Sequence, residues 1–457
     1  MSICQSTFET RTQAQIDSLT SSCSAECILE VAIAADSVNT NRKFSIALGC
    51  QLPDLQTANI PAGTTVYVEE LGVPVVAGSQ SWLGLDGRTY RKDKPDRQIW
   101  SWGEARDGAL GHGSQIDSSS PVREISSSTD WCFIRAGRCS SFAINYSGQL
   151  YSWGQNGSGG MLGDGTATGR CSPVQNYCSE TNWSYVSQGP GNTFGVKNDG
   201  TLWVWGGNTC GGLGLNDTVN RCSPVQEITN SRWCNAAAGG FGLVGTAIKT
   251  DGTLWSWGCN IWGQTATNDT VCYSSPVQEI TSSTNWCKVD FGNNHAMAIK
   301  TDGTLWGWGN GTLYGQLATY VKINYSSPIQ ELSSSTNWIA VSGGYAQSIG
   351  IKSDGTLWGW GRSDQGVLGV GVLCNYSSPV QEISSSTNWS DAGTGIRYST
   401  GIKTDGTIWS WGCNLTGTLA TGDTTCYSSP IQELTSATDW YAVSLADFHT
   451  AAIKQVV

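Results

Sequence analysis

The chain has few charged residues and very few histidines and methionines. Charged side chains make up 13% of its 457 residues, and there are only three histidines and three methionines. Acidic residues outnumber basic ones by 36 to 25, which gives a net charge of −11 at pH 7. A protein that neutralises nucleic-acid phosphates needs a basic tail or stripe, and residues 1–10 contain no basic side chain. We therefore expect no nucleic-acid partner.

Long apolar runs are also missing. A membrane-spanning helix needs about 20 mostly apolar residues in succession, and the sequence contains no such run. We therefore expect no membrane insertion. Residues 1–15 are polar, and we expect no secretory signal in this chain.

Catalytic signatures are equally scarce. The three histidines, His112, His295 and His449, are far apart, and we interpret the last two as packed structural residues because they hold the same repeat position. There is no Gly-x-Ser-x-Gly elbow, His-x-x-x-His pair or phosphate-cradling loop. In four repeats the same loop carries an acidic residue: Asp164, Asp217, Asp269 and Asp423. No loop supplies enough carboxylates for a calcium cage, and we interpret these residues as parts of solvated turns. We predict a non-enzymatic protein with no catalytic residue, cofactor or metal site.

What the chain does contain is a tryptophan repeat. A Trp-x-Trp-Gly phrase, with Tyr151 replacing the first tryptophan once, occurs seven times at steps of 51 or 52 residues. A fixed period of this length is typical of propellers and solenoids. Of the 22 tryptophans, 20 fall in repeated phrases, which favours core packing over photochemistry. The predicted blade-core aromatics are Trp102, Trp153, Trp205, Trp257, Trp308, Trp360 and Trp411.

Each period has four phrases in constant order. An aromatic phrase such as the one at Trp286 precedes an apolar stretch, then a turn, the Trp-x-Trp-Gly phrase, and Ser-Pro-Val/Ile. The turn is Asp-Gly in five copies, a strong hairpin signal for which we expect positive φ at both central residues. Proline cannot donate to a strand ladder, so the Ser-Pro strand should be the outer edge of its sheet. Four short strands per period predict one propeller blade each.

The order of the phrases predicts how the ring closes. The chain enters the repeat at Trp-x-Trp-Gly and leaves it after an apolar stretch. Residues 440–457 should therefore supply the first two strands of a blade that residues 98–125 complete, with Ile453 beside the strand of Trp100. We predict an all-β protein with a seven-bladed β-propeller of four-stranded blades, closed by both termini, over residues 96–457.

These phrases resemble the regulator of chromosome condensation repeat. The resemblance covers residues 98–457, and residues 292–309 followed by Tyr314-Gly-Gln-Leu317 match it best. It implies the propeller fold. It does not imply one activity, because that superfamily includes an exchange factor on chromatin, a plant ultraviolet-B photoreceptor and a bacterial inhibitor of β-lactamases.

Cysteine pairs recur in one loop of the repeat. Cys259 and Cys413 each follow Trp-Gly, and Cys272 and Cys426 come thirteen residues after them. We predict both pairs as disulfides. Cys210 and Cys222 span the corresponding loop of another blade and form a third candidate disulfide. Local disulfides favour an extracellular or virion location.

Asn-x-Ser/Thr sequences are compatible with the same location. In a chain so rich in Asn, Ser and Thr, chance also produces many of them. The candidate glycosylation sites are Asn216, Asn268, Asn310 and Asn414.

The first 95 residues differ from the repeats. We predict a helical segment over 1–39, because residues 10–35 carry apolar residues near heptad spacing. Such a helix would serve either for self-association or for packing on the neighbouring domain. We predict a small β attachment module over 40–95, with two strands around Glu69 to Gly72. Residues 40–92 resemble the small β modules of phage tail-fibre and appendage proteins.

These observations favour a structural and binding protein. We predict a phage virion (tail-fibre or appendage) or surface-filament subunit that assembles with itself or a larger particle through residues 1–95. Its propeller would be displayed to bind a host glycan or protein, weakly and many times over. The alternative is a secreted or cell-surface bacterial propeller that binds a protein partner, as an inhibitor or adhesin does.

Overall fold

The protein forms two compact units, residues 1–95 and residues 96–457. The computed structural model describes residues 95–457 except 158, 230, 241–243 and 457, together with the backbone of six strands before residue 95. No helix in these described parts is long and apolar enough to cross a membrane.

The first unit contains one six-stranded sheet, in the order β1 to β6. Strands β2 and β3 are parallel, and all other neighbours are antiparallel. The strands are β1 (Ala32–Ala34), β2 (Lys43–Ser45), β3 (Thr65–Val68), β4 (Val73–Ala77), β5 (Ser81–Gly84) and β6 (Thr89–Arg91).

Two predictions for this unit can be compared with the structure. Strands β3 and β4 confirm the hairpin expected around Glu69 to Gly72. The predicted helix over residues 10–35 is wrong at its end, because Ala32–Ala34 pair with β2 as a strand. A short apolar run fits either element, and here the strand partner decides. The rest of that helix lies outside the described residues.

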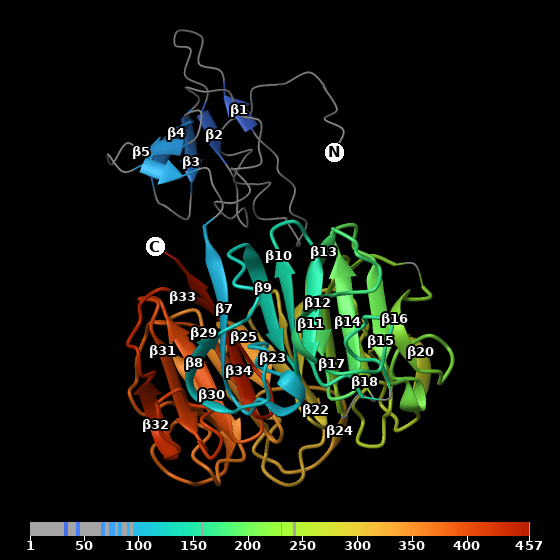
Figure 1. Ribbon diagram of the computed structural model, residues 1–457. Helices are drawn as coiled ribbons and strands as arrows, with labels where there is room; N and C mark the ends of the chain where they lie inside the picture. Colours follow the sequence, from blue (N-terminus) through green and yellow to red (C-terminus); the bar gives the residue numbers. More distant parts are fainter. Residues whose placement is uncertain are drawn as a thin grey trace. The chain divides into compact units, whose positions relative to one another are not determined.

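The second unit is a seven-bladed propeller of four-stranded antiparallel sheets (Figure 1). In each blade the strands follow one another outward from the central channel. From inner to outer strand, blade 1 is β9 (Trp131–Ala136), β10 (Ser140–Asn145), β11 (Leu150–Gly154) and β12 (Arg170–Gln175); blade 2 is β13 (Trp183–Gln188), β14 (Asn192–Lys197), β15 (Leu202–Gly206) and β16 (Arg221–Gln226); blade 3 is β17 (Trp233–Gly239), β18 (Val244–Lys249), β19 (Leu254–Gly258) and β20 (Tyr273–Gln278).

The remaining blades have the same plan, and short 3-10 turns follow β7 at Arg106–Gly108 and β15 at Thr209–Gly211. Blade 4 is β21 (Trp286–Phe291), β22 (His295–Lys300), β23 (Leu305–Gly309) and β24 (Tyr325–Gln330); blade 5 is β25 (Trp338–Gly343), β26 (Gln347–Lys352), β27 (Leu357–Gly361) and β28 (Tyr376–Gln381); blade 6 is β29 (Trp389–Thr394), β30 (Tyr398–Lys403), β31 (Ile408–Gly412) and β32 (Tyr427–Gln432); blade 7 is β33 (Trp440–Leu445), β34 (His449–Gln455), β7 (Arg97–Gly103) and β8 (Ser118–Arg123).

Blade 7 closes the ring with both ends of the propeller sequence, as predicted. Strand β34 pairs antiparallel with β7, which sets Ile453 opposite Ile99 and Ala452 opposite Trp100. Figure 1 shows the last strands of the chain beside β7 and β8. The Ser-Pro strand is outermost in every blade, which confirms its prediction as an edge strand.

The hairpin turn differs from the expected one in its backbone. In blade 4 the Gly303 N–H donates to the Lys300 carbonyl at 2.9 Å, and Gly303 alone has a positive φ, of 76°. The Asp302 carboxylate accepts the Thr304 N–H at 3.0 Å. The turn therefore needs the aspartate for this hydrogen bond, and it needs the glycine because that residue has a positive φ.

Neighbouring blades are joined through the second tryptophan of each Trp-x-Trp-Gly phrase. All seven of these side chains are 0% exposed. Each indole N–H donates to a backbone carbonyl in the long loop between the third and fourth strands of the preceding blade, here called its outer loop. The seven bonds, of 2.8–3.1 Å, are Trp102–Thr418, Trp153–Ala109, Trp205–Met161, Trp257–Gly212, Trp308–Gln264, Trp360–Gln316 and Trp411–Val367.

The first tryptophan of the phrase acts within its own blade. In blade 4 its indole N–H donates to the Thr304 hydroxyl at 2.8 Å. The Lys300 ammonium lies 4.4 Å from the ring centroid of this Trp306 and 4.5 Å from that of Trp286. Such cation–π contacts brace the hairpin against the inner strand. The same lysine position is filled in six blades, by Lys197, Lys249, Lys300, Lys352, Lys403 and Lys454.

A buried glutamate holds the link from each outer strand to the next inner strand. Glu331 accepts the Ser333 N–H at 2.7 Å and the Trp338 indole N–H at 3.4 Å. The equivalent residues are Glu124, Glu227, Glu279, Glu382 and Glu433. Asn176 replaces glutamate between blades 1 and 2, and neither its amide nor the Trp183 indole N–H has a hydrogen-bond partner among the described residues. The link between blades 1 and 2 therefore leaves more of its buried polar groups without a hydrogen bond than the other links do.

The inter-blade indole bond predicts unequal effects of two substitutions in one phrase. Trp308→Phe removes the bond to Gln264 and leaves a cavity, and we expect it to lower the free energy of unfolding by about 3 kcal/mol. Trp306→Phe changes a half-buried ring with a local bond and should cost about 1 kcal/mol. Denaturant unfolding of both variants measures the difference. Equal losses would contradict the role given to Trp308.

Candidate functional site

The inner strands enclose a cavity of about 550 Å³ along the axis of the propeller. Each inner strand begins with a buried tryptophan, and the register shifts just after it, as between Trp286 and Lys288. Side chains then alternate, so the second and fourth residues after the tryptophan line the cavity. Lys288 and Asp290 do so in blade 4, and Arg135 does so in blade 1.

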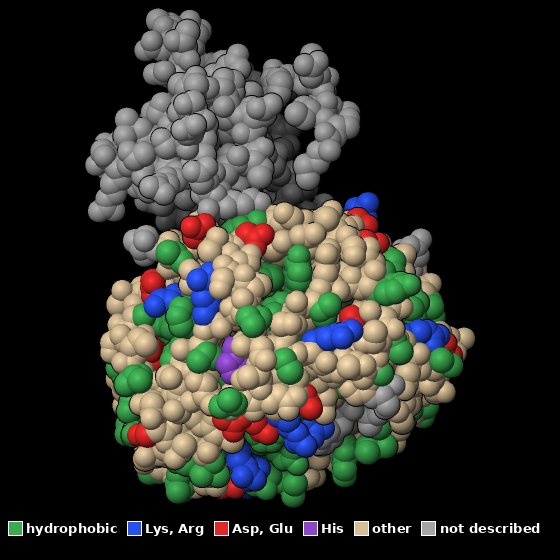
Figure 2. Space-filling model, in the orientation of Figure 1, with side chains coloured by type: hydrophobic (Ala, Val, Ile, Leu, Met, Phe, Trp, Pro, Cys, Tyr) green, Lys and Arg blue, Asp and Glu red, His purple; other side chains and the backbone are tan. Residues whose placement is uncertain are grey.

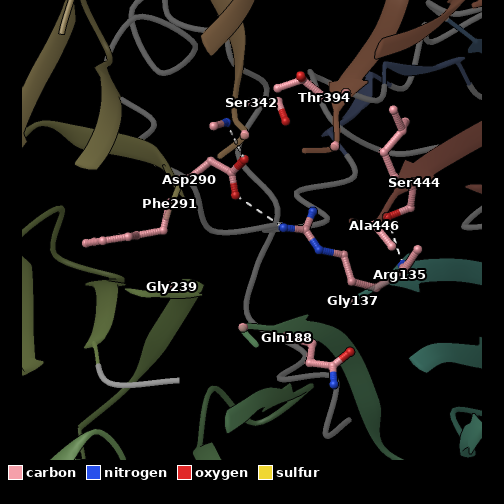
Figure 3. Close-up of a pocket in the computed structure, with 18 of the residues that line it drawn as sticks. Arg135, Gly137, Gln188, Gly239, Asp290, Phe291, Ser342, Thr394, Ser444 and Ala446 are labelled. Carbon is pink, nitrogen blue, oxygen red and sulfur yellow. Dashed lines mark hydrogen bonds and ion pairs between the residues drawn. The ribbon is translucent and has the colours of Figure 1, made fainter. Parts of the chain in front are cut away.

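An ion pair spans this cavity. The Arg135 guanidinium of β9 donates to an Asp290 carboxylate oxygen of β21 at 3.2 Å, joining blades 1 and 4 (Figure 3). The other Asp290 oxygen accepts the Gly343 N–H at 3.0 Å. Residues from three blades are therefore tied together across the axis.

A second pair of charges lies in the same cavity. The Lys288 ammonium donates to the Ile339 carbonyl at 2.6 Å. Burial raises the pKa of Asp391, although N–H groups of Val443 and Ala392 and the charges of Lys288 and Arg135 oppose that rise. Two cations thus face two carboxylates, and the cavity has no strong excess of either sign.

One end of the cavity opens between the turns that join first and second strands. Strands one and three of a blade run in the same direction, so these turns and the outer loops lie on one face, here called the loop face. At its centre Arg138 and Asp447 form an ion pair of 3.3 Å. Burial raises the pKa of Asp447 to about 6, against the lowering effect of Arg138.

An arginine packed between two tyrosines lies on the loop face. The Arg362 guanidinium carbon is 5.7 Å from the ring centroid of Tyr314 and 6.0 Å from that of Tyr345. Its Nε donates to Asp364 at 2.7 Å, and this bond raises the pKa of Arg362. Trp262 occupies the position of Tyr314 one blade earlier and is 36% exposed. Tyr314, Tyr345 and Arg362 form the loop-face cluster, and Trp262 lies in the outer loop of the preceding blade, blade 3.

In six blades the residue that opens the second strand is polar and hydrogen-bonds to the next blade, whereas Val244 fills this position in blade 3. His295 Nε2 is 2.8 Å from the Ser348 hydroxyl, and His449 Nε2 is 2.9 Å from that of Ser141. Both imidazoles are buried and hydrogen-bonded, as predicted for packed residues, and burial lowers the pKa of each to about 4. Gln347 fills the same position in blade 5 and donates to the Gly395 carbonyl.

The predicted cysteine pairs are neighbours with free thiols. Cys259 is hydrogen-bonded to Cys272, and Cys413 to Cys426. Both disulfides stay predictions. Cys272 and Cys426 also accept a backbone N–H that closes the outer loop, at 3.4 and 3.2 Å. Other blades use an Asx side chain for this bond: Asp117, Asn220, Asn324 and Asn375.

Cys210 and Cys222 do not occupy the positions of those pairs. Cys222 lies on β16 against Gly160 of blade 1, whereas Cys210 is near Cys259 of blade 3. The sequence carried a signal of this difference, because Cys210 and Cys222 are twelve residues apart and the other pairs thirteen.

The candidate glycosylation sites divide into two classes. Asn216 and Asn268 are exposed at the tips of outer loops. Asn310 is 7% and Asn414 0% exposed, and the Asn414 amide donates to the Asp423 carboxylate at 3.1 Å. The fold therefore offers only the first two to an enzyme. The recurring loop aspartates are partners of these buried asparagines, since Asp269 and Asp217 accept from Asn260 and Asn208 in the same way.

The rest of the surface carries few concentrated charges. Figure 2 shows Lys and Arg as separate spots interleaved with Asp and Glu on the face in view. Within the described part of the chain, no group of three or more His, Cys, Asp or Glu is arranged to hold a metal ion.

Comparison with known proteins identifies the repeat. Residues 199–244, 251–299, 354–402 and 405–453 match the regulator of chromosome condensation (RCC1) repeat, and a second description of that repeat matches residues 286–316. The chain thus contains these repeats within a seven-bladed propeller.

Several relatives share this similarity. The ultraviolet-B receptor UVR8 of Arabidopsis thaliana is 28% identical over 337 residues, which cover 71% of this chain and 75% of the receptor. The human regulator of chromosome condensation is 24% identical over 358 residues, or 73% of this chain and 84% of the regulator. The human E3 ubiquitin-protein ligase HERC2 is 25% identical over 288 residues, which cover 61% of this chain but only 6% of the ligase.

Solved structures share the fold. Prp20p from Saccharomyces cerevisiae superposes with a TM-score of 0.71 at 16% identity, covering 80% of this chain and 93% of Prp20p. Human WBSCR16 superposes with a TM-score of 0.68 at 18% identity, covering 79% of this chain and 99% of WBSCR16.

The buried histidines predict a dependence of stability on pH. Their folded pKa of about 4 lies below the ordinary value of 6.5, so the stability they contribute is complete above pH 6.5 and is lost as the pH falls towards 4. Each could account for roughly 3 kcal/mol. The double variant His295→Gln/His449→Gln uses the residue that blade 5 carries. Its free energy of unfolding should fall less than that of the parent between pH 7 and pH 4.5. Parallel decreases would show that other groups cause the effect.

Proposed function

We propose that the protein is a non-enzymatic binding protein that engages a protein partner with the loop face of its propeller. The observation that carries this proposal is the loop-face cluster. Tyrosine, tryptophan and arginine are the residues that contribute most often to binding energy in protein interfaces. Here Arg362 is held in place by Tyr314, Tyr345 and Asp364 before any partner binds, which limits the entropy lost on binding.

The outer loops that carry Trp262, Tyr314 and Arg362 also expose apolar side chains. The outer loops of blades 3, 4 and 5 expose Ile261, Val271, Leu313, Tyr320, Val321, Ile323, Val372 and Leu373. Consecutive outer loops lie close together, because each packs on the next blade, as where the Asn268 N–H donates to the Ser326 carbonyl at 2.7 Å. Contiguous exposed apolar groups on a soluble domain usually mark an interaction surface.

The opposite face consists of Asp-Gly turns and Ser/Thr-rich links. Its large exposed apolar side chains among the described residues are Ile339, Tyr441 and Val456, together with one in each link: Ile125, Tyr177, Ile228, Ile280, Leu332, Ile383 and Leu434. The preference for the loop face therefore rests on the contacts of Arg362 with Tyr314 and Tyr345, not on the amount of exposed apolar surface.

Named relatives support binding to proteins. The titles of two solved structures describe Prp20p as binding Gsp1p and histones, and as bound by Kap60. The net charge of −11 argues against nucleic acid as the ligand of this chain.

The narrower predictions remain part of this proposal. A virion or surface-filament role rests on the resemblance of residues 40–92 to phage appendage modules, and none of the relatives above supports it. Assembly through residues 1–95, binding of a host glycan and an extracellular location likewise stay predictions. A partner-binding propeller, the alternative in our sequence analysis, is the version that the loop-face cluster supports.

The proposal predicts different effects of substitutions on the two faces. Tyr345→Ala and Arg362→Ala should each weaken binding of the native partner about tenfold or more, since each removes part of a preorganised anchor. Tyr441→Ala is the matched control, because Tyr441 is 41% exposed on the opposite face and Tyr345 is 39% exposed. A photo-crosslinking residue at each position identifies the partner in cells that make the protein, and titration then gives the affinities. Crosslinks and affinity loss at residue 441 alone would contradict the proposal.

A further inference from the structure

Three cysteines, Cys210, Cys259 and Cys272, belong to the two outer loops where blade 2 packs against blade 3. Cys259 and Cys272 begin and end the outer loop of blade 3, and their side chains are hydrogen-bonded to each other. Cys210 belongs to the outer loop of blade 2 and is close enough to Cys259 for its charge to raise the pKa of that thiol. All three are free thiols in the structure.

Backbone packing explains this juxtaposition. The 3-10 turn Thr209–Gly211 lies against the start of β20, immediately after Cys272. The approach at Gly211 is so close that a Cβ atom there would be 2.4 Å from the Ser274 Cα. The turn is thereby fixed against blade 3, and Cys210 is presented to the neighbouring loop with a φ of 57°.

The three cysteines differ in ways that assign them chemical roles. Cys259 is 6% exposed, and burial is the main reason that its pKa is raised, so its thiol attacks another sulfur more slowly than an exposed thiol does. Cys210 and Cys272 are exposed. The Asn260 N–H lies 3.4 Å from the Cys272 sulfur and donates to it, so this sulfur keeps a hydrogen-bond donor when its bond to Cys259 breaks.

We propose that Cys210, Cys259 and Cys272 form a thiol–disulfide exchange site in which Cys259 bonds alternately to Cys272 within blade 3 and to Cys210 across blades 2 and 3. The Cys210 thiolate attacks the Cys259 sulfur of a Cys259–Cys272 disulfide. The new bond joins Cys210 to Cys259, the old bond breaks, and its electron pair leaves on the Cys272 sulfur. The exchange consumes no oxidant.

The first disulfide forms by exchange with a low-molecular-weight disulfide of the oxidised glutathione class. The exposed Cys272 thiolate attacks it, one glutathione thiolate leaves, and a mixed disulfide results. Attack by Cys259 on the Cys272 sulfur releases the second glutathione. Two protein thiols are oxidised, and one glutathione disulfide is reduced to two thiols.

Blade 6 provides an internal control. Cys413 and Cys426 repeat the geometry of Cys259 and Cys272, including the backbone N–H to the second sulfur at 3.2 Å. The preceding outer loop, however, carries Gln365 before Gly366 where blade 2 carries Cys210 before Gly211. Blade 6 therefore has the pair without the third thiol. The exchange site is independent of the proposed binding function, although its loop also carries Trp262.

The test is disulfide mapping of the full chain after equilibration with reduced and oxidised glutathione. Samples are quenched in acid and digested without reduction. In Cys272→Ser, Cys259 should be recovered bonded to Cys210, and in Cys210→Ser bonded to Cys272. In Cys426→Ser, Cys413 should stay unpaired, and adding Gln365→Cys should pair it with the introduced thiol.

Near-ultraviolet circular dichroism confirms that each variant is folded, and the intact Cys413–Cys426 pair reports on the redox buffer in the same digest. A folded Cys272→Ser variant with Cys259 unpaired or bonded to glutathione would overturn the proposal. Pairing of Cys210 with Cys222 in the parent chain would overturn it as well.

Discussion

The propeller depends on one hydrogen bond that occurs seven times. In each blade a fully buried indole N–H donates to a carbonyl in the preceding outer loop. A buried N–H without a partner is costly, so each blade is complete only when its neighbour is folded. The bonds of Trp102 and Trp153 extend this requirement across the closing blade, where strands from both ends of the propeller sequence pair. The result is a ring in which every blade constrains the next.

This constraint leaves the loop face and the channel free to vary. The repeat phrases lie within the blades, so residues of the turns and outer loops can differ from blade to blade without disturbing the ring. The individual features are found there: the Arg135–Asp290 pair across the cavity, the Arg362 cluster, and the three cysteines between blades 2 and 3. Function in repeat folds of this kind resides in such departures from the repeat.

The sequence was sufficient to predict features that local chemistry determines. Blade number, closure through Ile453 and the outer position of the proline strand follow from phrases that recur with a fixed period. The sequence was not sufficient to predict contacts between residues that are far apart in the chain, or elements whose local pattern fits more than one structure. Arg135 and Asp290 are 155 residues apart and hold the same repeat position in blades 1 and 4, so only the ring geometry brings them together. Ala32–Ala34 fitted a helix until its strand partner was known, and the turn at Asp302 is governed by a side-chain bond that the Asp-Gly signal does not reveal.

The most direct test of this account is hydrogen exchange of the tryptophan indole N–H groups, followed by nuclear magnetic resonance. If the inter-blade bonds hold the ring together, the seven buried indoles should exchange at one common slow rate, set by unfolding of the whole propeller. The exposed indole of Trp262 should exchange orders of magnitude faster. Fast or widely different rates among the seven would contradict the account, because they would mean that single blades open while the others remain closed.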